Sequence, residues 1–177
     1  QFNEIPNEIE NLINLTSINF SHNQINVMQN EIANLVNLTS LNLSNNNLSG
    51  ELPIEICNKF NLQTLDLSHN QLTTIPSEIG NLINLTTLYL NDNQLAGEIP
   101  ESLCNLSIDW DGEEWFGMEQ LYFNIEGNQL CPPYPDCISD HMGIQNSNCF
   151  SPEIINITDV PNDEGGWVNV HFTSCYY

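Results

Sequence analysis

Apolar positions recur from Leu15 to Leu95 at intervals of 23 or 24 residues. Three stretches align directly from Leu38, Leu62 and Leu85, and a fourth begins at Leu15. Within each stretch apolar and polar residues alternate, which is typical of a short strand with one buried face. The sequence therefore predicts a stack of similar units, each of which contributes one strand.

An Asn follows each expected strand at a fixed position, where the chain has to turn. This Asn column consists of Asn23, Asn46, Asn70, Asn93 and Asn128. An Asn amide both donates and accepts hydrogen bonds. We therefore expect the column to satisfy the backbone groups of turns that a stacked structure would bury.

The full pattern, L-x-x-L-x-L-x-x-N-x-L, resembles the leucine-rich repeat family. The second copy shows it most plainly, in Leu38, Leu41, Leu43, Asn46 and Leu48. The segments LSGELP and LAGEIP resemble the plant-type or bacterial subclass of this family. The resemblance implies an α/β-type repeat solenoid, a right-handed superhelix with short parallel strands on its concave face. The convex side is expected to be irregular or 3-10 helical, and a short β hairpin is expected near the C-terminus.

The register of the pattern predicts four segments. Residues 1–14 match the back half of a repeat, so we expect a partial repeat cut from a longer parent. Residues 15–107 contain four repeats, and residues 108–150 contain an acidic insertion, a degenerate fifth repeat and a cysteine-bearing cap. Residues 151–177 are too few to bury a core alone. They are expected to form a β tail, weakly similar to the start of an immunoglobulin-like or fibronectin-type module.

The insertion carries Trp110, Trp115 and Phe116 among acidic residues. We expect these aromatic side chains to cover the last hydrophobic layer of the solenoid. A binding loop is the alternative, because long insertions in repeat proteins also serve that purpose.

The six cysteines indicate an oxidised cap. Cys57 and Cys104 lie two repeats apart, ~10 Å at the usual strand spacing, which exceeds the reach of a disulfide. Cys57 is therefore expected to be a buried free thiol. Cys131 and Cys137 are the favoured disulfide because they close a tight loop, and a bond from Cys104 to a cap cysteine is the alternative. Cys149 and Cys175 are candidates for a bond across the tail. A cap of this kind resembles those of extracellular leucine-rich repeat proteins and favours an extracellular or cell-surface location.

The chain has 23 acidic residues, one lysine and no arginine, which gives a net charge of −22. This charge excludes nucleic-acid binding as a function and disfavours anionic membranes. It is compatible with salt adaptation, calcium or a basic partner. No calcium-loop motif is present, and His22 and His69 would lie ~10 Å apart at the strand spacing. We therefore expect no metal, no cofactor and no membrane insertion in this segment.

The polar positions between the buried leucines should point onto the concave face. Most of them are small, and the exceptions lie in the C-terminal half: Asp66, Tyr89, Asp92, Tyr122 and Glu126. Tyrosines are frequent interface anchors. We therefore predict that these five residues bind a ligand. The alternative is that they are ordinary solvated strand residues.

These patterns predict a monomeric, non-catalytic recognition module of a secreted or cell-surface protein. Resemblance to the family implies a protein, peptide or glycan ligand on the concave face. The alternatives are a structural spacer or adhesin stalk without a ligand, and an intracellular interaction scaffold. An enzyme is the least favoured reading because no oxyanion hole or catalytic cleft is indicated.

Overall fold

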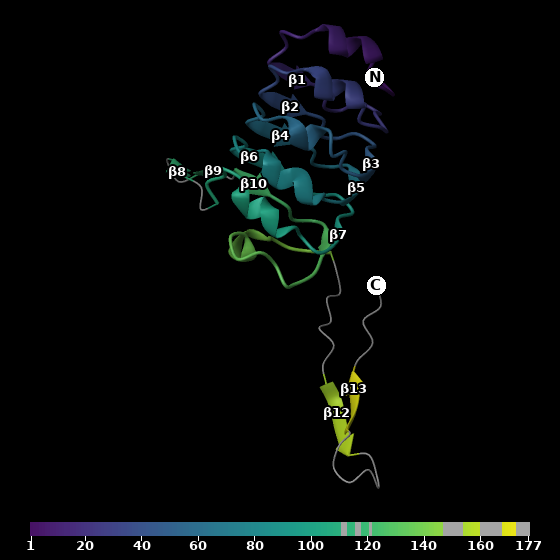
Figure 1. Ribbon diagram of the computed structural model, residues 1–177, viewed down its shortest axis with the longest axis vertical. Helices are drawn as coiled ribbons and strands as arrows, with labels where there is room; N and C mark the ends of the chain where they lie inside the picture. Colours follow the sequence, from purple (N-terminus) through teal and green to yellow (C-terminus); the bar gives the residue numbers. More distant parts are fainter. Residues whose placement is uncertain (111–112, 116–117, 121, 147–153, 160–167, 173–177) are drawn as a thin grey trace. The chain divides into compact units, whose positions relative to one another are not determined.

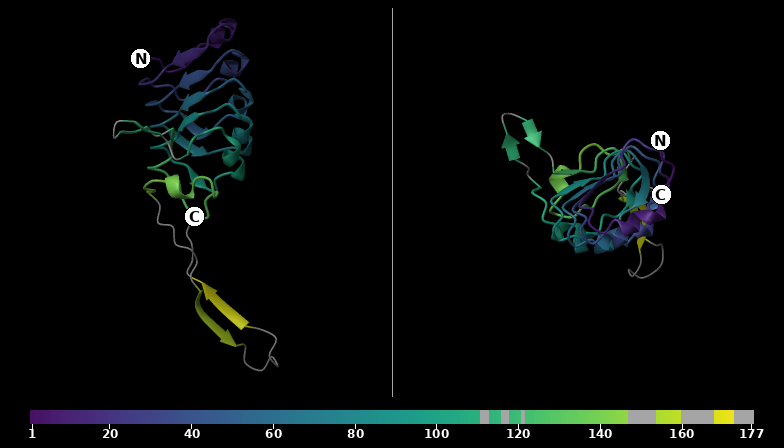
Figure 2. Two further views of the ribbon diagram at one scale, coloured as in Figure 1. Left: turned by 90° about the vertical axis from the view of Figure 1, so that its left-hand side faces the viewer. Right: turned by 90° about the horizontal axis from the view of Figure 1, so that it is seen from above.

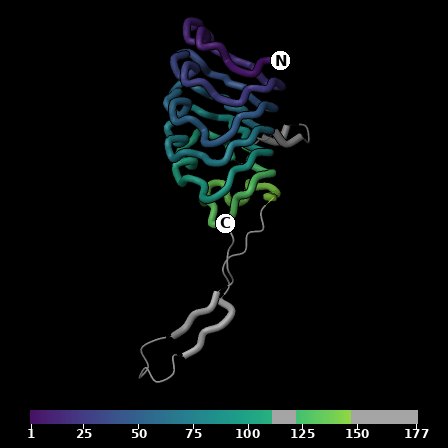
Figure 3. The backbone as a smooth tube through the Cα atoms, turned by 90° about the vertical axis from the view of Figure 1, so that its right-hand side faces the viewer, coloured from purple at the N-terminus to yellow at the C-terminus, as the bar shows by residue number. Residues whose placement is uncertain are grey.

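The computed structural model describes residues 1–110, 113–115, 118–120, 122–146, 154–159 and 168–172 (Figure 1). The chain divides into two compact units, Gln1–Ser147 and Asn148–Tyr177. The first unit is a solenoid of stacked coils, which the backbone trace follows turn by turn (Figure 3). The predicted repeat solenoid is confirmed.

A five-stranded parallel sheet forms one side of the solenoid. Its strands, in spatial order, are β1 (Ser17–Asn19), β2 (Ser40–Asn42), β4 (Thr64–Asp66), β6 (Thr87–Tyr89) and β10 (Phe123–Asn124). The middle apolar residues of adjacent strands are register partners, as Leu41 and Leu65 show. Phe123 pairs with Leu88, so the degenerate fifth repeat continues the sheet.

Short 3-10 helices form the opposite side of each coil (Figure 2). They are η1 (Asn7–Asn11), η2 (Asn30–Asn34), η3 (Ile56–Asn58), η4 (Ser77–Asn81) and η5 (Glu101–Asn105). Pro6, Pro76 and Pro100 precede three of them with extended backbones. Proline suits this position because the first amides of a helix have no intrahelical partner.

Four further strands follow the turns and were not predicted from the sequence. β3 (Ser49–Glu51) pairs with β5 (Gln71–Thr74), and β7 (Ala96–Gly97) pairs with β11 (Gln129–Leu130). Gly50 and Gly97 have φ angles of 81° and 84°, in the region that favours glycine. The G-E-L-P and G-E-I-P segments therefore mark a second, smaller set of strand pairs.

One leucine column of the core contains the only lysine of the chain. Lys59 ends η3 at the position that Leu35 and Leu82 hold after η2 and η4, and both leucines are fully buried. Lys59 is only 5% exposed as a residue, so its methylene stem takes the place of a leucine side chain. Burial lowers the pKa of its ammonium group.

The last repeat is covered from two directions. The Trp110 ring meets the Phe123 ring edge to face, with 5.1 Å between centroids. Beyond β11, Ile138 and Met142 are buried on either side of η6 (Ser139–His141). Trp110 thus acts as a cover, whereas the side chains of Trp115 and Phe116 lie outside the described residues. The insertion also contains the antiparallel strands β8 (Glu113–Trp115) and β9 (Met118–Gln120).

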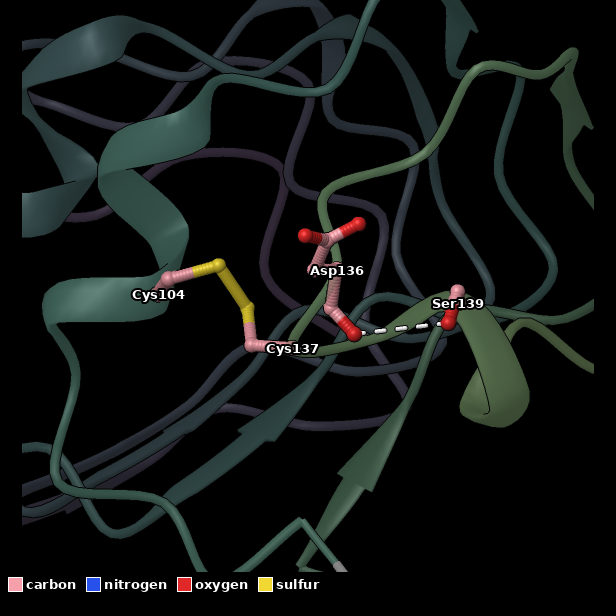
Figure 4. The surroundings of a disulfide bond; sticks show 4 residues. All are labelled: Cys104, Asp136, Cys137 and Ser139. Carbon is pink, nitrogen blue, oxygen red and sulfur yellow. Dashed lines mark hydrogen bonds between the residues drawn. A yellow bond between two sulfur atoms is a disulfide. The ribbon is translucent and has the colours of Figure 1, made fainter.

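The cap is joined to the solenoid by a disulfide between Cys104 and Cys137 (Figure 4). Their Cα atoms are 5.7 Å apart. The favoured pairing of Cys131 with Cys137 was therefore wrong, and the alternative through Cys104 was right. The cap stacks directly on the coil that carries η5, so Cys137 lies next to Cys104. Cys131 is also disulfide-bonded. Cys57 is a buried free thiol, as expected.

The second unit contains two antiparallel strands, β12 (Ile154–Asp159) and β13 (Val168–Phe172). They coincide with the two strands expected in the tail. Cys149 and Cys175 lie outside the described residues, and the likeness to an immunoglobulin-like or fibronectin-type module remains a prediction.

Candidate binding face

The internal Asn column holds neighbouring coils together. Asn70 accepts a hydrogen bond from the Leu48 amide at 3.0 Å and donates to the Leu43 and Leu67 carbonyls at 3.0 and 3.1 Å. Its side chain therefore links its own turn to the coil before it. The other members bind in the same way: Asn23, Asn46, Asn93 and Asn128. These amides, all buried except that of Asn23, fix the spacing of the strands and so the geometry of the sheet face.

The central column of the concave face, the outer side of the five-stranded sheet, has a simpler role. The Asn42 Oδ1 accepts hydrogen bonds from the Ser44 amide and hydroxyl at 2.9 and 2.8 Å. The Asp66 Oδ1 accepts the equivalent pair from Ser68 at 3.1 and 2.7 Å. Asn19 and Asn124 also bind the amide two residues later. Each of these side chains therefore closes the turn of its own repeat.

Tyr89 is the exception in this column. It is the register partner of Asp66 on one side and Asn124 on the other. Its single polar atom lies at the far end of a ring, so it cannot bind the amide two residues later as an Asn does. Burial raises the pKa of Tyr89, and the neighbouring Asp66 and Tyr122 raise it further. The structure therefore brings three of the five predicted residues together, with Asp66 and Tyr89 on adjacent strands and Tyr122 directly before β10.

The other two predicted residues lie beyond the strands. Asp92 follows β6 by three residues and has a φ of 54°. Its carboxylate lies 3.4 Å from the His69 ring, and both side chains are about half exposed. Glu126 lies against the cap, because a Cβ at Gly143 would sit 2.6 Å from the Glu126 Cβ. Asp92 and Glu126 therefore border the turn edge of the face and are not strand residues.

The left-handed turn that holds Asp92 recurs in every repeat and was missed in the sequence. Its members are His22, Asn45, His69, Asp92 and Gly127, with φ angles from 53° to 71°. Their residue types were the signal, because Asn, Asp, His and Gly tolerate positive φ best. This column turns the chain after each strand, so its residue types have a backbone explanation.

The charge near this face is negative. Among the described residues, the one contact between a basic and an acidic side chain joins His69 and Asp92, and it is an ion pair only when the imidazole is protonated. The only lysine is buried elsewhere. The same part of the chain contains no group of three or more His, Cys, Asp or Glu residues arranged to hold a metal ion.

Comparisons with known proteins identify the class. A leucine-rich repeat model matches residues 37–59, and a model of two such repeats matches residues 61–107. The chain belongs to the leucine-rich repeat family. No curated protein sequence matches it. Within the described residues, no helix is long and apolar enough to span a membrane.

Three solved structures illustrate the likeness. The Arabidopsis receptor kinase HAESA, in complex with the peptide hormone IDA and the co-receptor SERK1, has a TM-score of 0.67 and 33% identity over 80% of this chain. The plant peptide hormone receptor RGFR1, in complex with RGF2, has a TM-score of 0.58 and 32% identity over 75%. A plant ice-binding protein has a TM-score of 0.61 and 31% identity over 72%. The chain spans 23%, 24% and 39% of these three proteins, respectively.

Proposed function

We propose that this chain is a recognition module that binds an extended peptide across the C-terminal half of its concave face. Asp66, Tyr89 and Tyr122 form the proposed contact surface. The observation that carries the proposal is the substitution of Tyr89 into a column of turn-closing side chains. A half-buried tyrosine adds a large, rigid surface with a polar tip, and such residues dominate binding energy at interfaces.

The likeness to peptide receptors supports the choice of a peptide. HAESA and RGFR1 share about a third of their aligned residues with this chain, and both are described in complex with peptide hormones. The chain spans only part of such proteins, so the proposal concerns the binding segment. No catalytic step is proposed for it.

The charge of the face favours a basic peptide. Asp66 contributes a carboxylate beside Tyr89, while Asp92 and Glu126 add negative charge along the turn edge. Complementary charge raises association rates and excludes acidic competitors. The ligand we propose therefore carries lysine, arginine or a free amino terminus near an apolar or aromatic side chain.

We further propose that the module acts outside the cell. The Cys104–Cys137 disulfide joins the cap to the last regular repeat, and Cys131 is disulfide-bonded too. Structural disulfides persist mainly in oxidising compartments. Alkylation of the unreduced native protein should therefore leave Cys104, Cys131 and Cys137 unmodified.

The test is selection of peptides from a random displayed library on the immobilised chain. Tyr89→Asn is the decisive variant because it restores the side chain that other repeats carry at this position. We expect selected peptides to be basic and to bind this variant at least ~10-fold more weakly, a loss of about 1.4 kcal/mol.

Asn19→Tyr is the matched control, since it adds a tyrosine to the same column at the other end of the sheet. It should leave affinity unchanged. Peptides that bind wild type and Tyr89→Asn equally would remove the proposed site. Failure to select any peptide would favour the structural spacer.

A further inference from the structure

A second surface lies on the flank of the solenoid, just before the strands. An open trough with a volume of about 410 Å³ runs across four successive repeats there. One Asn from each repeat lines it: Asn14, Asn37, Asn61 and Asn84. Thr16, Thr39 and Gln63 complete the lining. We name this surface the amide trough.

The amide trough is uncharged in a chain of net charge −22. No acidic residue occurs in the four segments that build it, which are residues 11–17, 34–40, 58–64 and 81–87. The one base in them, Lys59, is buried among core residues. The uncharged lining of the trough therefore disfavours a charged ligand and favours a neutral, polar one.

The Asn side chains of the trough are held in place by the preceding coil. Asn37 donates to the Ile13 carbonyl at 2.9 Å, and Asn61 donates to the Val36 carbonyl at 2.9 Å. Asn84 donates to the Phe60 carbonyl at 2.6 Å. One N–H of each of these amides is thus bound by the preceding coil, while the amide oxygen accepts no hydrogen bond from the described residues and stays available as an acceptor. The trough presents a preorganised row of acceptors, one per repeat.

An apolar row accompanies the acceptors. The residue before each Asn is hydrophobic and more than half exposed: Ile13, Val36, Phe60 and Ile83. Single exposed apolar residues are ordinary, but a row aligned across four repeats is typical of a binding surface. The paired rows of acceptors and apolar side chains complement a ligand that has alternating hydroxyl groups and C–H faces.

We propose that the amide trough binds a neutral polysaccharide chain, laid along the solenoid axis with about one sugar ring per repeat. Sugar hydroxyls donate to the Asn oxygens, and the ring faces rest on the apolar row. The strands recur every ~4.8 Å, close to the advance per ring of an extended hexose chain. An extended peptide repeats its outward groups only every ~6.8 Å, so it does not match successive repeats. The hollow form of the trough also fits an extended chain better than it fits the flat surface of an ice crystal.

The test is calorimetric titration of the 177-residue chain with neutral hexasaccharides of β-1,4-glucose, β-1,3-glucose, mannose and N-acetylglucosamine. At least one should bind, with a Kd that changes less than ~2-fold between about 50 and 500 mM salt, because no charge pair is involved. An anionic galacturonate hexamer should not bind.

The decisive variant is Asn37→Leu with Asn61→Leu, which removes two acceptors and should weaken binding at least ~10-fold. Phe60→Ser is the second variant; its side chain is 58% exposed, so the fold should survive and the affinity should fall several-fold. Tyr89→Asn should leave hexasaccharide binding unchanged. This control separates the amide trough from the proposed peptide site.

Two results would overturn the proposal. The first is that none of the neutral hexasaccharides binds. The second is that a bound hexasaccharide is retained by the double variant. In the first case, ice crystals shaped by the wild type and not by the double variant would assign the trough to ordered water.

Discussion

Two columns of side chains run through the same five repeats and differ in how freely they vary. The internal column is Asn in every copy, whereas the central column of the concave face contains Asn19, Asn42, Asp66, Tyr89 and Asn124. An internal Asn binds backbone atoms of its own turn and of the preceding coil. In the central column, the Asn42 and Asp66 side chains bind only groups of their own turn. The comparison indicates that a side chain with fewer backbone hydrogen bonds can change its residue type and become available for ligand binding.

Asn70→Ala should break the internal column with the largest effect. It leaves the Leu48 amide without its partner. The Leu43 and Leu67 carbonyls each lose one hydrogen bond and keep those from Asn46 and Asn93. We expect the free energy of unfolding to fall by about 4 kcal/mol, since an unsatisfied buried amide costs about 1–3 kcal/mol and each of the two lost carbonyl bonds about 0.5–1.5 kcal/mol. Urea unfolding measures this. Asn47→Ala, an exposed neighbour in the same turn as Asn46, should change it by less than about 0.5 kcal/mol. A loss below 1 kcal/mol at Asn70 would contradict this reading.

Removal of the Cys104–Cys137 disulfide tests whether the end of the internal column needs its cap. The bond spans 33 residues, and the chain-entropy model gives a loss of about 3–4 kcal/mol for a loop of that length. Cys104→Ser with Cys137→Ser should therefore lower the urea midpoint strongly. Hydrogen exchange of the Leu95 amide, which donates to Asn128, should accelerate more than that of the Ile25 amide. Equal acceleration would show that the cap does not protect this end selectively.

Cys57 is a buried residue with a titratable thiol, so pH provides a further test of the interior of the solenoid. Burial, followed by the nearby Glu78 and Glu55, raises its pKa to about 12. The folded state holds the thiol proton more tightly than the unfolded state, so stability is lost as pH rises from about 9 towards 12. The loss at pH 10 should be about 1.4 kcal/mol. Urea unfolding of wild type and Cys57→Ala across this range measures it, and parallel pH profiles would contradict the prediction.

The central column should give the smallest effects. Asn42→Ala removes two hydrogen bonds from Ser44 and should cost about 1 kcal/mol. Tyr89→Asn should restore a turn-closing side chain and leave stability unchanged or raised by up to about 1 kcal/mol. Thermal unfolding of both variants tests this. A large loss on Tyr89→Asn would mean that the tyrosine is structural.

The sequence predicted the features that repeat. Leu41, Leu65 and Leu88 are register partners because their spacing encodes one coil per repeat. The same periodicity placed Cys57 in the core and five strands in one sheet. Phe123 could be aligned despite the long insertion because Asn128 lies five residues after it, as Asn93 does after Leu88.

Features set by local backbone geometry or by the order of stacking were not predicted. Loop length favoured Cys131 with Cys137, whereas the docking of the cap on η5 joins Cys137 to Cys104. The β3–β5 and β7–β11 pairs were missed because β3 and β7 contain a glycine with positive φ and no alternating apolar pattern. At the candidate site, the sequence predicted both Tyr89 and Asp66 as binding residues. It did not predict the turn-closing role of Asp66, which accepts a hydrogen bond from the Ser68 amide.

The burial of Lys59 has a practical consequence for handling the protein. Trypsin cleaves after lysine and arginine, and these 177 residues contain one such peptide bond, at a residue that is 5% exposed. The folded segment should therefore resist trypsin, and a digest after unfolding should give two large fragments. Cleavage after Lys59 therefore reports unfolding of this segment.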